Sequence, residues 1–246
     1  MKTEFVKSID STNTYLYEKA LRGEFKTERA ICADTQLKGK GRRGRSFYSP
    51  DDTGLYLSLL LFPKCTVKEA EKITTMMAVS AAKAAGALSG EDVRIKWVND
   101  LYLNGKKISG ILTECSPDIT DGRPSFVVTG IGINILMPEG GFPEDIRDKA
   151  GPLLKRIPEG YDSVTDFKRK LAAGIIDEFE KIYADFPASD FIDEYRNLGM
   201  LDGTTVRILD GPSVTVMGIE DDFGLKVRHE DGSIEILRAG EISLVL

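Results

Sequence analysis

The stretch VRIKWVNDLYLNGKKISGILTE, residues 93–114, decides the fold expected for this chain. Its extended runs, rich in β-branched and aromatic residues, are interrupted by Asn104-Gly105, the dipeptide most typical of a tight β-hairpin. A second turn signal, Asp121-Gly122, precedes another extended run over residues 125–135. Strands joined by tight turns are antiparallel, so this region predicts an antiparallel sheet.

Expected helices lie on both sides of this region in the sequence. Ser11 and Ser163 are residue types that cap helix N-termini, and Thr66 with Glu69 has the spacing of a capping box. Helices beside consecutive antiparallel strands predict an α+β fold, with a mixed, largely antiparallel sheet and flanking helices. The expected helices follow Ser11, span 66–88, follow Ser163 and span about 189–198, and further strands are expected at 29–35 and 55–62.

The chain changes character after Gly199. Short apolar runs there are separated by turn dipeptides such as Asp210-Gly211 and Asp231-Gly232, which predicts a small β unit, a barrel of SH3-like size. Residues 137–162 are rich in Gly and Pro and are expected to be irregular. We therefore expect a large domain over residues 1–198 and a small one over 199–246.

Composition excludes several classes of function. The net charge of −6 argues against a general nucleic-acid binder, and no apolar run approaches the roughly 20 residues of a membrane span. Three widely spaced cysteines suggest a reduced, cytoplasmic protein without disulfides or a zinc site. His229 is the only histidine, which leaves little room for a His-based catalytic triad or metal site.

The seven residues from Gly39 to Arg45 contain three glycines and four cations. They match the G-x-G-x-x-G pattern, but Ser46-Phe47-Tyr48-Ser49-Pro50 follows, which cannot open the helix that a dinucleotide fingerprint needs. No G-K-[ST] sequence closes a Walker loop either. Two interpretations are left, a solvated charge run or a mobile loop that grips anions.

Five motifs occur in one order along the chain, and together they resemble the biotin protein ligase family. The resemblance runs from about Asp10 to Asn134 and resumes over residues 239–244. It implies a catalytic domain of the class II synthetase and biotin ligase type over residues 1–198. The motifs are Ser11-Thr12-Asn13, Gln36 with the glycine loop, Trp97 to Leu101, Lys106 to Leu112 and Gly130 to Asn134.

The resemblance implies a reaction between biotin and ATP, giving biotinyl-5′-AMP and pyrophosphate, followed by transfer of biotin to one lysine of a biotin carboxyl carrier domain. ATP, Mg²⁺ and biotin would be required. Two anions must be brought together in such a reaction, so positioning and charge stabilisation carry most of the catalysis. No protein nucleophile is needed, which suits a chain with a single histidine.

By the same resemblance, each motif residue has an expected role. Lys107, Arg42 and Asp100 would be catalytic, with Asp100 a candidate for orienting or deprotonating the acceptor lysine. No protein side chain is assigned to a metal. The residues expected to bind biotin are Ser11, Thr12, Asn13, Gln36, Lys40, Gly41, Arg42 and Lys107. Those expected to bind ATP or the adenylate are Arg42, Arg43, Arg45, Trp97, Asn99 and Asn134.

Three residues depart from the family pattern. Lys40 replaces an arginine and loses its bidentate geometry, Phe47 stands where Trp is common, and Val98 replaces the usual proline between Trp97 and Asn99. Each departure could weaken retention of the adenylate without removing the reaction. The biotin motif begins at Ser11, so we expect a ligase without an N-terminal winged helix and without DNA as a partner. Homodimerisation is left open.

Two other functions compete with biotin ligation. Lipoate or octanoate ligation shares the catalytic fold, but the basic glycine loop and the Lys107 segment match the biotin branch better. An RNA-binding module using the cationic loop is the alternative from another class. The acidic net charge of −6 argues against RNA binding.

Overall fold

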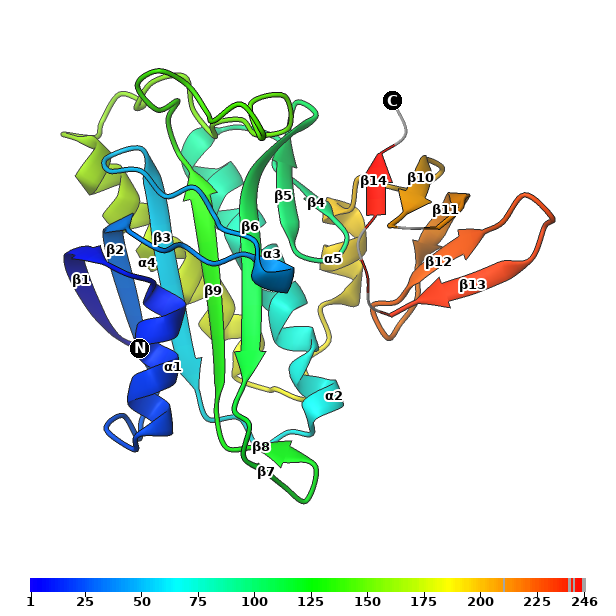
Figure 1. The fold of residues 1–246 in the computed structure, drawn as a ribbon, viewed down its shortest axis with the longest axis horizontal. Helices are drawn as coiled ribbons and strands as arrows, with labels where there is room; N and C mark the ends of the chain where they lie inside the picture. The colour runs from blue at the N-terminus through cyan, green and yellow to red at the C-terminus, as the bar shows by residue number, and fades with distance from the viewer. Residues whose placement is uncertain (210, 239, 241, 245–246) are drawn as a thin grey trace.

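The computed structural model of the chain describes residues 1–209, 211–238, 240 and 242–244. A seven-stranded sheet forms its centre, and its strand order is β1-β2-β3-β9-β6-β5-β4 (Figure 1). A five-stranded sheet follows at the C-terminal end, and β7 (Ile119–Thr120) pairs with β8 (Arg123–Pro124) in a small third sheet. In sheet order, the large sheet contains β1 (Lys2–Ile9), β2 (Arg29–Gln36), β3 (Gly54–Leu61), β9 (Val127–Asn134), β6 (Lys106–Cys115), β5 (Asp100–Leu103) and β4 (Arg94–Lys96).

The large sheet is antiparallel except at one edge, as expected for a mixed sheet. β1 pairs with β2 in parallel, and the remaining neighbours in this sheet pair antiparallel. Asn104 and Gly105, which connect β5 to β6, have φ values of 50° and 75°, so the predicted hairpin turn is confirmed. β1 was not expected, because its sequence has no continuous apolar run and its side chains are mostly exposed at the sheet edge.

Helices cover both faces of the large sheet. α1 (Thr12–Leu21) packs on one face, where Leu16 contacts a small cluster that includes Leu60. α3 (Lys72–Ser89) and α4 (Val164–Tyr183) cover the other face. Alternate residues of β3, among them Leu57 and Leu59, belong to the core cluster that these helices form with the sheet. Since strand side chains alternate between faces, Tyr56 and Ser58 lie on the same side of the sheet as Leu60.

The predicted helix caps form as expected. Ser163 Oγ accepts a hydrogen bond from the Asp166 backbone N–H, and Ser11 Oγ accepts one from the Thr14 N–H. The capping box is complete, with Thr66 N–H donating to the Glu69 carboxylate at 2.7 Å and Glu69 N–H donating to Thr66 Oγ1 at 3.2 Å. The helix expected over 66–88 divides at Glu71 into α2 (Val67–Ala70) and α3.

The C-terminal sheet has the strand order β13-β12-β11-β10-β14. The strands predicted after Gly199 are therefore confirmed as a small β unit. Two residues of the segment that resembles the family's closing strand, Ala239 and Glu241, lie outside the described residues. The strands are β10 (Thr205–Ile208), β11 (Ser213–Ile219), β12 (Leu225–Arg228), β13 (Ile234–Leu237) and β14 (Ile242–Leu244).

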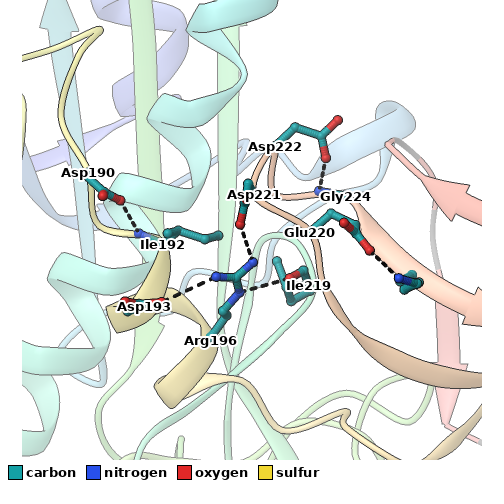
Figure 2. A network of polar contacts seen from close by, with 10 residues as sticks. Asp190, Ile192, Asp193, Arg196, Ile219, Glu220, Asp221, Asp222 and Gly224 are labelled. Carbon is teal, nitrogen blue, oxygen red and sulfur yellow. Dashed lines mark hydrogen bonds and ion pairs between the residues drawn. The ribbon is translucent and has the colours of Figure 1, made fainter.

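The C-terminal sheet lies beside α5 (Ile192–Leu198), as Figure 1 shows, and hydrogen bonds connect it to α5 and to the residue that follows β4. Trp97 Nε1 donates a 2.9 Å hydrogen bond to the Phe223 carbonyl oxygen. Arg196 of α5 donates to the Ile219 carbonyl oxygen at 2.9 Å and to Asp221 at 2.7 Å (Figure 2). These contacts fix the loop between β11 and β12 against the end of β4.

Two kinds of feature are absent from the described part of the chain. None of the helices there combines the length and apolar character needed to cross a membrane. The same residues contain no cluster of three or more His, Cys, Asp or Glu side chains placed to hold a metal ion.

Candidate functional site

A cavity of about 420 Å³ opens on the α1 side of the large sheet. The N-terminus of α1, the glycine loop, the β5–β6 hairpin, β9 and β14 all contribute to its lining. Segments far apart in the sequence therefore meet in one space. Twelve of the fourteen predicted site residues line it: Ser11, Thr12, Asn13, Gln36, Lys40, Gly41, Arg42, Arg45, Trp97, Asn99, Asp100 and Lys107.

Arg43 and Asn134 do not line the cavity. Arg43 is exposed at the tip of the loop, with a φ of 55°. Asn134, at the end of β9, uses its Nδ2 to donate to the Gly151 carbonyl oxygen at 3.3 Å. Their expected contacts with a nucleotide stay predictions.

One end of the cavity is polar but uncharged; we call it the uncharged end and define it by Ser11, Thr12, Asn13, Gln36 and Ser58. Gln36 Oε1 accepts a hydrogen bond from the Thr12 backbone N–H at 2.9 Å. Ser58 Oγ lies 2.7 Å from Thr12 Oγ1 and 2.6 Å from Asn13 Oδ1. The Ser11-Thr12-Asn13 run thus both caps α1 and presents side chains to the cavity.

The two glycines of Gly130-Ile131-Gly132 are explained by close approach. A Cβ at Gly130 would lie 1.9 Å from Asn13 Oδ1, and one at Gly132 would lie 2.4 Å from the Phe47 ring. Both distances are far below van der Waals contact. β9 therefore carries glycine where the uncharged end and the glycine loop press against the sheet.

The other end of the cavity is cationic; it is defined here by Lys40, Arg42, Arg45 and Lys107. Lys107 Nζ forms an ion pair with Asp100 Oδ1 at 2.7 Å, where Lys107 is 36% exposed and Asp100 is 17% exposed. Arg42 donates a 2.9 Å hydrogen bond to Asn99 Oδ1. Because charge-assisted donors bind phosphate and carboxylate strongly, this end suits an anionic ligand.

The glycine loop is folded back on itself beside this end. Phe47 N–H donates to the Gly39 carbonyl oxygen at 2.9 Å, and Gly41 N–H donates to the Arg45 carbonyl oxygen at 2.7 Å. A short helical turn, η1 (Arg42–Gly44), forms the tip. The loop thus folds over the cavity, and Lys40, Arg42 and Arg45 contribute to its lining; that it binds an anion stays a prediction.

Asn99 links the loop to the sheet. Its Nδ2 donates to the Ile111 carbonyl oxygen at 2.9 Å while its Oδ1 accepts from Arg42. The Ile111 N–H in turn donates to the Asn99 carbonyl oxygen at 2.9 Å. The position of Arg42 is consequently set by the β5–β6 hairpin.

Several cavity residues were missed in the sequence. Asp148 and Lys149 come from the irregular segment, which is anchored because Lys107 N–H donates to the Lys149 carbonyl oxygen at 2.8 Å. Neither has a local signal that would have identified it. Ser58 does have one, since it is a lone serine in the apolar strand Gly54–Leu61.

Two further missed residues come from the large sheet. Tyr102 lines the cavity, and burial, with a smaller contribution from Asp100, raises its pKa to about 12, so its hydroxyl is protonated near neutral pH. Lys96 is buried, and its Nζ donates to the Ile242 carbonyl oxygen of β14 at 2.7 Å. This bond holds the C-terminal strand at the cavity.

Comparison with known proteins agrees with this geometry. A model of the biotin/lipoate A/B protein ligase family matches residues 5–134. The chain belongs to this family. Within it, the chain is 31% identical over 219 residues to the bifunctional ligase/repressor BirA of Bacillus spizizenii, a match covering 85% of the chain and 64% of that relative. It thus spans less than two thirds of that relative's length.

Other members extend the comparison. The chain is 30% identical over 242 residues to the bifunctional ligase/repressor BirA of Escherichia coli, covering 96% of the chain and 72% of that protein. The solved structure of the biotin protein ligase from Aquifex aeolicus in complex with biotin and ATP is 27% identical. It superposes with a TM-score of 0.76, covering 99% of this chain and 98% of the Aquifex chain. The α+β fold with a large, mostly antiparallel sheet is therefore that of the biotin ligases.

Proposed function

We propose that this chain is a biotin–protein ligase. It activates biotin with ATP to give biotinyl-5′-AMP, and then transfers biotin to a lysine of a biotin carboxyl carrier domain. The single observation that carries the proposal is one cavity joining the uncharged end to the cationic end. A ligand with a neutral hydrogen-bonding head and an anionic tail, next to a nucleotide phosphate, matches that division.

The expected biotin contacts fit the uncharged end. Ser11, Thr12, Asn13 and Gln36 would bind the ureido head, while Lys107 would lie at the biotin carboxylate and the α-phosphate. Biotin attacks phosphorus through its carboxylate oxygen, and pyrophosphate leaves. Lys107 offsets the charge that builds up on the phosphoryl oxygens, which is a form of preorganised electrostatic stabilisation.

Arg42, Arg45, Trp97 and Asn99 would bind the adenylate. Lys40 and Gly41 would complete the cover over the mixed anhydride and limit its hydrolysis, since excluding water protects a reactive intermediate. Asp100 is proposed to position Lys107 through their ion pair during activation. It would then orient the incoming lysine of the carrier domain during transfer.

Mg²⁺ is proposed to enter with ATP. The cavity offers two carboxylates, Asp100 and Asp148, and Mg²⁺ in such sites is bound by one or two carboxylates, water and substrate phosphates. This donor set fits an ion held chiefly by the triphosphate. When bound, the ion neutralises phosphate charge.

The lipoate alternative is disfavoured by the uncharged end. A dithiolane ring has neither an N–H donor nor a carbonyl acceptor, so it would make no conventional hydrogen bond to the hydroxyl and amide groups that line this end. Sites built to pair polar edges reject ligands that lack them by large factors.

The remaining parts of the proposal concern organisation. Residues 1–198 would form the catalytic domain, and 199–246 a domain of SH3-like type, consistent with its five-stranded antiparallel sheet. Two copies would pair through the open edge at β1, because an edge strand offers unpaired backbone groups. Buried thiols at Cys32 and Cys65 suit a reducing, cytoplasmic environment. Sedimentation equilibrium tests the dimer.

The activity is tested by ATP–pyrophosphate exchange. Exchange should appear on adding biotin and stay at background with lipoate or octanoate. Mass spectrometry of a carrier domain should then show one added biotin. Exchange that depends on lipoate instead would overturn the biotin assignment in favour of the other branch of the family.

A further inference from the structure

A second cavity lies at the β1 edge of the large sheet, on the face that α4 covers. Its volume is about 210 Å³, half the 420 Å³ of the site described above. We call it the edge pocket and define it by the charged side chains that line it, which are Lys7, Asp34, Lys168 and Arg169. Three cations thus surround one carboxylate, and none of these residues has a part in the proposed reaction.

Three elements of the fold bring these charges together. The register of β1 and β2 places Lys7 beside Asp34, and side chains two positions apart on a strand share a face. Phe5 and Lys7 of β1 therefore point to the same side. The Arg169 guanidinium of α4 lies over the Phe5 ring, 5.4 Å from its centroid. The edge pocket is thus closed from both the sheet and the helix.

Lys168 is the unusual member of this group, because its side chain is only 2% exposed. Within the part of the chain that the structure describes, its ammonium group has one hydrogen-bonding partner, Asp34 Oδ1 at 3.4 Å. Charge-assisted hydrogen bonds are usually 2.7–2.9 Å long, and the exposed Lys38 reaches Asp10 at 2.7 Å. An ammonium group has three donors, and a buried charge is costly unless it is well paired. Asp34, itself 37% exposed, compensates Lys168 incompletely.

A buried thiol supports the closeness of these charges. Cys32 lines the edge pocket, and its pKa is raised to about 12, mainly by burial. The Asp34 carboxylate raises this pKa further, whereas Lys168 and Arg169 lower it. All three charges therefore act on one small volume.

We propose that the edge pocket is a binding site for a compact oxyanion of the phosphate class, with Lys168 as its buried anchor. The three cations exceed the one carboxylate by two charges, which matches a phosphate dianion. Charge-assisted N–H donors are the groups that hold such an ion, and the Thr165 hydroxyl in the lining adds a neutral donor. The bound anion gives Lys168 the second partner that the protein does not supply.

This site is separate from the proposed substrate cavity. α4 lies on the opposite side of the large sheet from α1 (Figure 1), and the two cavities share no lining residue among those the structure describes. The inference therefore does not depend on the proposed function. Phosphate also suits the cationic end of the large cavity, so the test has to separate the two places.

Titration calorimetry with inorganic phosphate tests the proposal, with sodium chloride of equal ionic strength as the reference. The measurements use the full chain carrying Arg42→Gly and Lys107→Ala, which removes two cations from the large cavity. Phosphate should still bind this background protein. Adding Lys168→Met, which keeps an unbranched side chain without the charge, should weaken binding about 10-fold or more, the scale of a lost hydrogen bond to a charged group.

Asp34→Asn separates an anion site from an ion pair that only joins α4 to β2. It removes the single negative charge of the edge pocket, so phosphate should bind about 2- to 5-fold more tightly, the range for partly exposed charges. Lys170→Gln is the matched control. Lys170 is the next lysine of α4, pairs with Asp166 at 3.1 Å and is not part of the lining, so its loss should leave the affinity unchanged.

Three results would overturn the inference. One is a phosphate titration of the background protein that matches the chloride reference. Another is unchanged phosphate affinity in Lys168→Met. The third is weaker binding in Asp34→Asn, which would assign Lys168 and Asp34 a structural role alone. Circular dichroism checks folding, and the exposed pair Lys7→Gln with Arg169→Gln, which should also weaken binding, replaces Lys168→Met should that variant unfold.

Discussion

Lys107 Nζ lies 2.7 Å from Asp100 Oδ1 at the cationic end of the cavity. The two residues come from neighbouring strands, β6 and β5. The backbone N–H of Lys107 also donates a hydrogen bond to the Lys149 carbonyl oxygen. The ion pair therefore holds the amine, and the backbone hydrogen bond holds the residue that carries it. Such a cation is preorganised for charge that develops in a reaction.

Lys107→Ala should abolish adenylate formation while the fold is kept. Removing one preorganised donor costs about 100- to 1000-fold in rate, and Lys107 is 36% exposed, so its loss leaves no core cavity. Biotin-dependent pyrophosphate exchange measures the effect. Exchange near the wild-type rate would remove Lys107 from the catalytic role.

Arg42→Gly should release biotinyl-AMP, since Arg42 is the loop residue tied to Asn99 at 2.9 Å. Labelling of lysines on a bystander protein should rise, because the opened loop no longer holds the intermediate. The control is Lys38→Ala, which removes a neighbouring cation that pairs with Asp10 and lies outside the cavity lining. Labelling restricted to the carrier domain in Arg42→Gly would contradict the role of the loop.

Gly130→Ala should destabilise the protein and weaken biotin binding. The new Cβ would lie 1.9 Å from Asn13 Oδ1, and relieving such an overlap typically costs about 1–3 kcal/mol. Gly174→Ala is the control. Gly174 lies inside α4, where alanine is favoured over glycine by about 0.5–1 kcal/mol, and its new Cβ would meet Ala84 Cβ of α3 at 3.4 Å, an ordinary contact distance. Denaturant unfolding should move in opposite directions for the two variants.

Trp97→Phe should loosen the C-terminal sheet. The substitution removes the indole N–H that donates to the Phe223 carbonyl oxygen at 2.9 Å. Leaving a buried acceptor unpaired lowers the free energy of unfolding by about 1–3 kcal/mol. Hydrogen exchange should increase in the loop between β11 and β12. Unchanged exchange in that loop would show that the Arg196 contacts in Figure 2 hold it alone.

Cys32 and Cys65 should resist alkylation while the protein is folded. Burial is the main cause that raises the pKa of Cys32 to about 12 and of Cys65 to about 11, and the thiolate is the reactive form. At pH 8 both thiols are therefore protonated, and reactivity should grow only as the pH rises toward those values. Mass spectrometry after iodoacetamide treatment, with and without denaturant, checks this.

Much of the fold was accessible from local sequence. The capping box at Thr66 and Glu69 and the turn at Asn104-Gly105 depend on neighbours in the chain, and both are confirmed. The unexpected strand β1 shows the limit. An edge strand with few buried side chains carries little hydrophobic periodicity, so its pairing with β2 was decided by the sheet rather than by its own residues.

The candidate site divides in the same way. The sequence by itself determined the local features of the site, which are the glycine loop, its cations and the cap of α1. These features depend on the backbone freedom and charge of the residues themselves. Only the tertiary structure decided that Ser58 donates to Thr12, that Asp100 pairs with Lys107 and that β14 reaches the cavity. The bond from Lys96 to Ile242 joins residues 146 positions apart, and no short stretch of chain encodes a contact over such a separation.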